Sequence, residues 1–162
     1  MIRSPMQSAP HQPAGPPLHA LTEWAGYLAV APFALCLAGV GLLGDYGARE
    51  LAQRTAIAWG AVLLAFTGAV HWGLALAGRL PWEAARAAAL LPALIGGAAV
   101  LLGGQRALAL LVIGFGGWWL YEHRALKALL PEAYLNLRRP LTLATCILLA
   151  LTMFASDAGG LG

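Results

Sequence analysis

The spacing of the charged residues divides most of the chain into long apolar runs. Asp, Glu, Lys and Arg are absent from residues 24–44, 55–78, 87–105, 107–121 and 140–156. A helix of about 20 apolar residues crosses the hydrocarbon layer of a bilayer, and one charge at its centre costs roughly 2.5 to 3.5 kcal/mol on insertion scales. The pattern therefore predicts an all-α protein, a polytopic membrane helix bundle with five transmembrane helices.

The predicted helices differ in how well they fit a bilayer. They cover about residues 24–44, 55–78, 87–105, 107–128 and 140–156, within a transmembrane domain of residues 21–157. The fourth charge-free run is short, so its helix is expected to continue to residue 128, and the fifth must thin the bilayer or lean on its neighbours. The main alternative is an even number of crossings. It would follow if residues 103–106 form no turn and the third and fourth runs make a re-entrant hairpin.

The first 20 residues differ from the rest of the chain. Five of the ten prolines lie there, and the apolar residues follow no regular period. Such a segment cannot bury enough apolar surface to offset the entropy lost on ordering. Residues 1–20 are therefore expected to form a disordered Pro-rich cytoplasmic tail that lacks the features of a signal peptide.

Composition agrees with a membrane protein, and the basic residues predict its orientation. Apolar residues make up 60% of the chain, charged residues 10%, and the mean hydropathy is +0.71. With the N terminus inside, the inner segments carry Arg3, Arg79, Arg86, Arg124, Lys127, Arg138 and Arg139, and the outer segments carry Arg49, Arg54 and Arg106. The positive-inside rule therefore predicts an N-in, C-out topology. The net charge of +3 then belongs to the inner face, so lipids and other membrane proteins, and no nucleic acid, are the expected partners.

His71 is the first candidate functional residue. It lies seven residues before the end of the 55–78 run, about 10 Å into the bilayer at 1.5 Å per residue. A buried histidine can simply bond a carbonyl of a neighbouring helix, which is the packing interpretation. Ionisable groups are rare inside membranes, however, and histidine exchanges protons near neutral pH, which favours a functional interpretation. The hypothesis places His71 in an inner-leaflet pocket between the first, second and fourth helices. Trp72 would line this pocket, and Glu122 or His123 would be its polar neighbour.

A second group of candidate ligand-binding residues lies between the fourth and fifth charge-free runs. It comprises Glu122, His123, Arg124, Tyr134, Arg138 and Arg139. Arginine binds carboxylates and phosphates bidentately, and Pro140 suits the first position of a helix. Arg138, Arg139 and Tyr134 are therefore predicted to form an anion site at a helix N-terminus. The alternative is that the arginines only set the topology and contact lipid phosphates without selectivity.

Metal and catalytic chemistry are not expected. Cys36 and Cys146 lie at different predicted depths, so a disulfide is not expected, and no spacing of His and Cys suggests a metal or a cofactor. Every carboxylate lies at a loop or a helix end, whereas an intramembrane enzyme usually needs paired carboxylates or a nucleophile with its base. We therefore expect no enzymatic activity, no metal site and no cofactor.

Three short segments resemble a known family. They are GAVHWG at 68–73, WWLYEHR at 118–124 and YLNLRRPLT at 134–142. These segments are similar to those of a bacterial family of five-pass inner-membrane proteins that is classified as a domain of unknown function. That family is itself similar to a mitochondrial multi-pass transmembrane protein. The resemblance implies a five-helix, multi-pass protein of the bacterial inner membrane. It supplies no activity, substrate or catalytic residue.

Two functions stay open on the sequence alone. The first is a small accessory or assembly protein that packs against larger membrane complexes, which the helix-packing glycines favour. The second is the binding or transport of a small amphiphile, such as a quinone, a lipid or an acidic metabolite, at the inner-leaflet pocket around His71. An enzyme is the weakest alternative, because the necessary groups are not found together.

Overall fold

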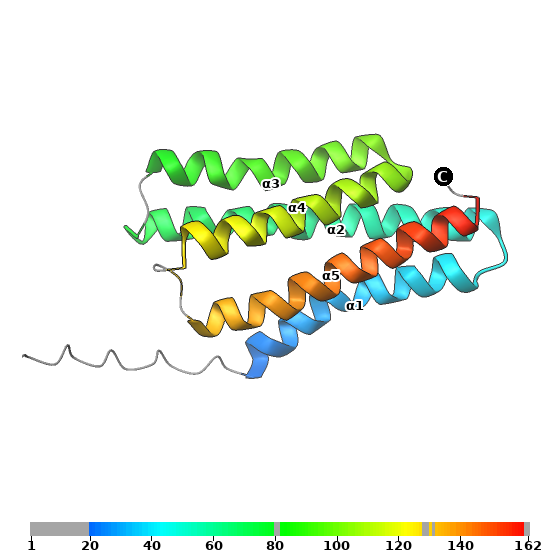
Figure 1. The fold of residues 1–162 in the computed structure, drawn as a ribbon, viewed down its shortest axis with the longest axis horizontal. Coiled ribbons are helices and arrows are strands. Elements are labelled where there is room, and N and C mark those ends of the chain that lie inside the picture. The colour runs from blue at the N-terminus through cyan, green and yellow to red at the C-terminus, as the bar shows by residue number, and fades with distance from the viewer. Residues whose placement is uncertain (1–19, 80–81, 128–129, 131, 161–162) are drawn as a thin grey trace, which may run out of the picture.

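The computed structural model describes residues 20–79, 82–127, 130 and 132–160, without the side chains of 20–22, 82–88 and 125. Within these residues, all regular secondary structure is helical. The helices are α1 (Ala20–Leu42), α2 (Tyr46–Leu76), α3 (Trp82–Leu102), α4 (Gly104–Ala125) and α5 (Glu132–Ala158) (Figure 1). The predicted all-α class is therefore confirmed. The predicted disordered tail, up to residue 19, lies outside the described residues and stays a prediction.

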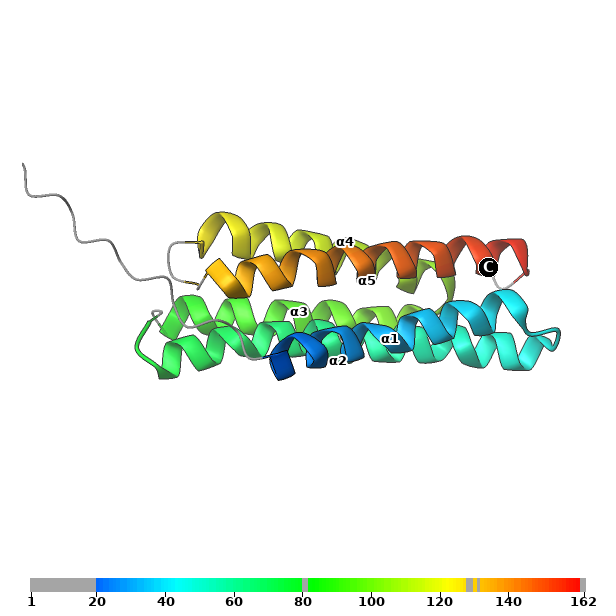
Figure 2. The same cartoon turned by 90° about the horizontal axis from the view of Figure 1, so that it is seen from below.

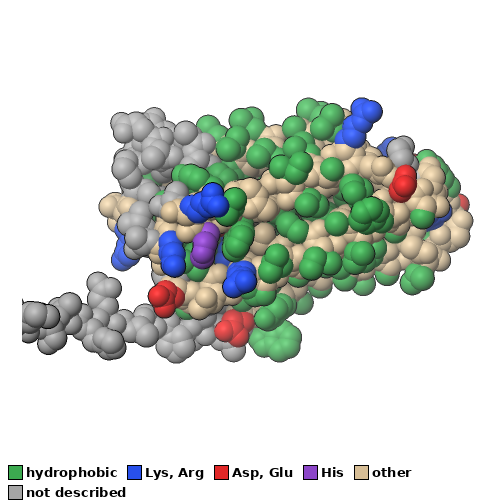
Figure 3. Space-filling view, in the orientation of Figure 1, with side chains coloured by type: hydrophobic (Ala, Val, Ile, Leu, Met, Phe, Trp, Pro, Cys, Tyr) green, Lys and Arg blue, Asp and Glu red, His purple; other side chains and the backbone are tan. Residues whose placement is uncertain are grey.

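Three of the described helices are long and apolar enough to cross a membrane. They are α1 from Glu23 to Leu42, α2 and α5, while the apolar stretch of α3, Ala89–Leu102, is shorter. Leu101 is 89% exposed and Leu35 is 74% exposed. Figure 3 shows charged side chains near the two ends and a mostly apolar flank between them. Soluble monomers rarely expose apolar surface of this extent, so the fold suggests a membrane protein; the number of crossings and the orientation stay predictions.

The helix ends differ from the predicted ones. α2 begins at Tyr46 because the carboxylate of Asp45 caps it and accepts a hydrogen bond from the Ala48 N–H at 2.8 Å. α5 begins at Glu132, so the prediction that Pro140 opens this helix is wrong, and Pro140 lies inside it. The absence of charge marks the apolar span, whereas caps and packing decide where a helix begins and ends. Polar turns therefore extend both helices beyond their charge-free runs.

α2 lies at the centre of the bundle. It packs between α1 and α3 in one layer, and α4 and α5 form a second layer over them (Figure 2). Glycines let α2 and α3 approach closely, since a Cβ added to Gly96 would lie 2.9 Å from the carbonyl oxygen of Ala61. The buried core between the two layers includes Phe33, Leu64 and Leu111.

The two ends of the bundle carry different polar groups. α1 starts, α2 ends, α3 starts, α4 ends and α5 starts at one end, which we call the Arg138 end (Figure 1). The opposite end, which we call the Asp157 end, holds the α1–α2 and α3–α4 connections and the last turn of α5. This antiparallel arrangement brings residues 68–73, 118–124 and 134–142 to the same end of the molecule.

Candidate functional site

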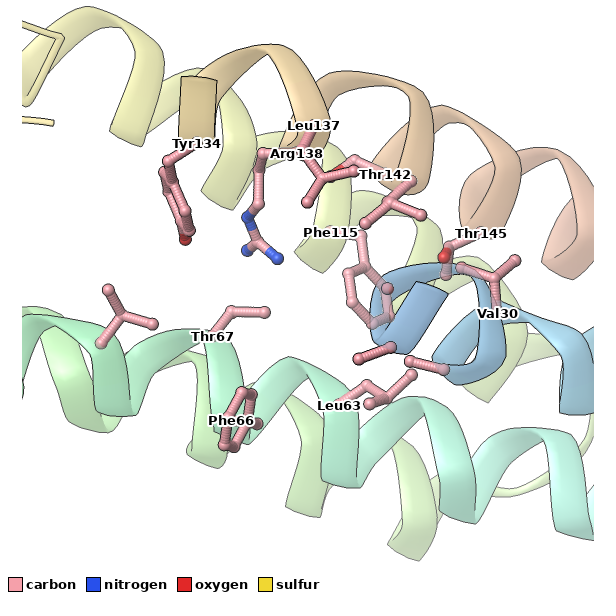
Figure 4. A pocket seen from close by; sticks show the side chains of 15 residues that line it. Val30, Leu63, Phe66, Thr67, Phe115, Tyr134, Leu137, Arg138, Thr142 and Thr145 are labelled. Atoms are coloured by element: carbon pink, nitrogen blue, oxygen red, sulfur yellow. The ribbon is translucent and has the colours of Figure 1, made fainter. Parts of the chain in front are cut away.

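A cavity of about 310 Å³ lies near the Arg138 end between α1, α2 and α5 (Figure 4). This volume lies within the range of small-molecule sites. Its walls are largely apolar and include Gly26, Leu63, Phe66 and Leu141, while α4 contributes only Phe115. This cavity differs from the predicted pocket between the first, second and fourth helices, because α5 takes the place assigned to α4. The reason is the layer arrangement, in which α5 covers the groove between α1 and α2.

One face of α5 supplies the polar side of this cavity. Tyr134, Arg138, Thr142 and Thr145 all line it, and their spacing of four, four and three residues places them along one side of a helix. Figure 4 shows Tyr134 and Arg138 reaching from α5 towards α2. Arg138 is the one charged residue among those that line the cavity. The cavity thus combines a positive group near the bundle end with an apolar interior.

Arg138 is held by a buried carboxylate. Its Nε donates a hydrogen bond to Oε2 of Glu122 at 3.1 Å. The side chain of Glu122 is 1% exposed and that of Arg138 is 17% exposed. The two terminal nitrogens of the guanidinium donate no hydrogen bond within the described residues. Glu122 therefore orients the guanidinium through its Nε atom and does not engage the two terminal nitrogens.

Several buried polar atoms surround this ion pair without a partner. Among the described residues, both ring nitrogens of His71, Nε1 of Trp118 and Oε1 of Glu122 have no hydrogen-bond partner. The His71 and Trp118 rings meet edge to face with centroids 4.9 Å apart. The carbonyls of Thr67 and Gly68 lie near the imidazole but do not meet hydrogen-bond geometry. A buried unpaired polar group costs about 1 to 3 kcal/mol, so this cluster favours bound water or a ligand.

The structure brings together half of the predicted ligand-binding residues. His71, Glu122, Tyr134 and Arg138 gather near the Arg138 end, and Glu122 is close enough to His71 for its charge to act on the imidazole. His71 does not line the cavity, although Thr67, one turn earlier on α2, does. Glu122 is therefore the polar neighbour of His71, while His123 is exposed. Binding of a ligand by any of these residues stays a prediction.

The other predicted residues lie on the surface. Trp72 is 47% exposed, His123 stacks on Trp119 with centroids 5.4 Å apart, and both Arg124 and Arg139 are exposed. Because α5 starts at Glu132, the helix N-terminus lies too far from Arg138 to add free N–H groups, so the predicted anion site at the start of the helix is wrong in that respect.

Sequence analysis missed the two threonines on the polar side of the cavity. Thr142 is 6% exposed and Thr145 is 4% exposed, and both line the cavity together with Arg138. Their helical spacing from Arg138 was a visible signal. The assumption that Pro140 starts the helix hid it, because residues before and after the proline then seemed to belong to different elements.

Within the described residues, no group of three or more His, Cys, Asp or Glu side chains is placed to hold a metal ion. Cys36 and Cys146 are free thiols. Around the cavity near Arg138, the polar chemistry comes from Arg138 itself, from Glu122 and His71 beside it, and from several hydroxyl groups.

The helical fold and its apolar flank are typical of a membrane protein. Arg138 is the one charged residue among those that line the first cavity. The chain belongs to the family described as "Protein of unknown function (DUF3429)", whose model matches residues 18–154. The match begins before α1 and ends in the last turns of α5, so it covers nearly the whole bundle. No curated protein matches the chain, and no solved structure matches it.

Proposed function

We propose that the protein is an integral membrane protein that binds an amphiphile with an anionic headgroup in the cavity between α1, α2 and α5. The observation that carries this proposal is the division of the cavity into an apolar interior and one end with Arg138 as its charged residue. An acyl or prenyl chain would occupy the interior, and a carboxylate or phosphate would lie at Arg138.

The headgroup contact decides the selectivity in this proposal. A lipid tail that moves from the bilayer into an apolar cavity exchanges one apolar environment for another, so it gains little hydrophobic free energy. A guanidinium with free terminal donors can give two parallel hydrogen bonds to an oxyanion. Glu122 is the positioning residue, because its bond to Nε orients Arg138 and leaves those donors available.

The proposal includes a location and a topology. We place the protein in the bacterial inner membrane with five crossings, the N terminus inside and the C terminus outside. The Arg138 end then faces the cytoplasm, as its larger share of Lys and Arg supports, and the ligand enters from the inner leaflet. We propose a binding or transport role and no catalytic one.

Copurification tests the amphiphile proposal directly. Wild-type protein and the variants Arg138→Gln and Arg139→Gln are purified from native membranes in a mild neutral detergent, and bound lipids, quinones and acidic metabolites are identified by mass spectrometry. Arg139 is the matched control, because it is adjacent in sequence, has the same charge and is exposed. Loss of a charge-assisted hydrogen bond should reduce the retained anionic amphiphile about tenfold in Arg138→Gln. Equal retention by both variants would contradict the proposal.

A second candidate function is the accessory or assembly role. It is favoured by mid-helix glycines that face open space, since a Cβ added to Gly97 of α3 or to Gly117 of α4 would meet nothing within 4 Å. Small residues on an open helix face let another membrane helix approach closely. The same copurification would test this role. A membrane complex retained by the wild type and lost from Gly97→Leu and Gly117→Leu, with no amphiphile bound, would favour it over ligand binding.

A further inference from the structure

A second cavity, of about 510 Å³, lies at the Asp157 end between α2, the end of α3 and the start of α4. It shares no lining residue with the cavity beside Arg138. Ile57, Ala58 and Val100 form apolar parts of its wall, and Gln53 and Gly103 form polar parts. Anything bound here is therefore independent of the proposed amphiphile.

Gln53 is the unusual residue of this wall. It is 3% exposed, and its Nε2 has no hydrogen-bond partner among the described residues. An amide nitrogen is a donor only, and a buried donor without an acceptor destabilises the fold. Gln53 lines the cavity, so a rotation of its side-chain amide that turns Nε2 towards an acceptor bound there would remove this cost.

The start of α4 adds further donors to the same cavity. Its N-cap is Gly103, with φ of 63° and no side-chain cap, and Gly104 has φ of 58°. The first helical hydrogen bond runs from the Ala107 N–H to the Gly103 carbonyl, so the N–H groups of residues 104–106 have no partner within the helix. A Cβ added to either glycine would meet nothing within 4 Å. An uncapped helix N-terminus, where the helix dipole favours negative charge, thus opens onto the cavity.

The charged residues of the wall do not oppose an anion. Glu50 and Arg54 line the cavity and form an ion pair with 2.6 Å between Oε1 and Nη2, so the charge of the arginine offsets that of the carboxylate. We propose that this cavity binds an oxyanion, a carboxylate or a phosphate, with Nε2 of Gln53 and the N–H groups at the start of α4 as its donors. The oxyanion is either free or part of a lipid headgroup.

Titration of the full-length protein in neutral detergent with inorganic phosphate and with acetate tests the free-anion form. The side-chain amide resonance of Gln53, assigned by its loss in Gln53→Leu, reports on the site itself. We expect it to shift on titration, and we expect calorimetry to give an affinity about tenfold weaker for Gln53→Leu, as loss of a hydrogen bond to a charged group predicts. Gln53→Glu should bind still more weakly, because it places a carboxylate beside the anion.

Nanodiscs of phosphatidylcholine with and without phosphatidylglycerol test the headgroup form by the same resonance. Shifts with phosphate or acetate assign a free oxyanion, and shifts only with phosphatidylglycerol assign a lipid headgroup; either result supports the proposal. Ser156→Ala is the matched control, since Ser156 is a buried polar residue at the same end but donates to the carbonyl of Thr152 at 2.7 Å and does not line the cavity. No shift with any of these probes, or equal affinity for the wild type and both Gln53 variants, would overturn the proposal. Arg138→Gln should leave the site unchanged, so this result does not depend on the amphiphile cavity.

Discussion

The two ends of the bundle differ in whether their polar groups have hydrogen-bond partners. At the Asp157 end, Arg49 donates to the carbonyl of Val40 at 2.9 Å, Gln105 donates to Asp157 at 3.0 Å, and Ser156 donates to the carbonyl of Thr152 at 2.7 Å. At the Arg138 end, His71, Trp118 and Glu122 all bury atoms that have no partner within the described residues. The polar groups just named at one end have partners on the same or a neighbouring helix, whereas those at the other end surround an ion pair beside a cavity.

The comparison shows that an unpaired buried polar atom is more informative than a polar residue as such. Within the part of the chain that the structure describes, the exception at the Asp157 end is Nε2 of Gln53, and Gln53 lines the second cavity. At the Arg138 end, the residues with unpaired atoms do not line the first cavity themselves but surround the ion pair of Arg138, which does line it. Gln105, whose side chain already has a partner, lies outside both cavities.

The largest expected difference between the ends is the compartment they face. Reporter fusions after Gly15 and after Gly162 should be active on opposite sides of the membrane, with the N-terminal fusion in the cytoplasm, because an odd number of crossings separates the termini. Reporters active on the same side would rule out five crossings and would favour the alternative with an even number.

The next largest difference concerns the two ion pairs. Glu122→Leu should lower the free energy of unfolding by about 3 kcal/mol, because it leaves Arg138 without its buried counter-ion. Glu50→Leu should lower it by less than about 1 kcal/mol, because the partner Arg54 is 73% exposed and exposed pairs contribute little. Unfolding of both variants in the same detergent measures the difference. Equal losses would mean that the Glu122–Arg138 pair is no more important to stability than a surface pair.

The smallest expected effects on stability concern two polar side chains, one with a hydrogen-bond partner and one with none among the described residues. Gln105→Leu should cost about 0.5 kcal/mol, because it removes an exposed hydrogen bond to Asp157. His71→Leu should cost nothing or raise stability slightly, because neither ring nitrogen has a hydrogen-bond partner among the described residues. Thermal unfolding in detergent compares the two. A clear loss of stability in His71→Leu, with unchanged amphiphile retention, would make His71 a packing residue.

Sequence patterns predicted the helical class and several members of the candidate site. The charge-free runs identified the apolar part of each described helix, and antiparallel connections explain why Glu122 was expected near His71 and why Arg138 lies at the same end. The helix ends were less predictable. Asp45 and Pro140 show the reason, because a cap can start a helix well before its apolar span and a proline can lie within a helix whose neighbours support it.

The sequence by itself determined which residues are apolar, where charges interrupt them and which segments share an end of the bundle, since these depend only on the order of residues and the length of a helix. Only the tertiary structure decided that α5, and not α4, closes the cavity, that Arg138 faces inward while Arg139 is exposed, and that Gln53 is buried without a partner. The physical reason lies in the rotation of each helix about its own axis. In a nearly all-apolar helix the hydrophobic pattern scarcely marks which side faces the core, so the orientation of each helix is fixed only when close-packed neighbours and small residues such as Gly96 select it.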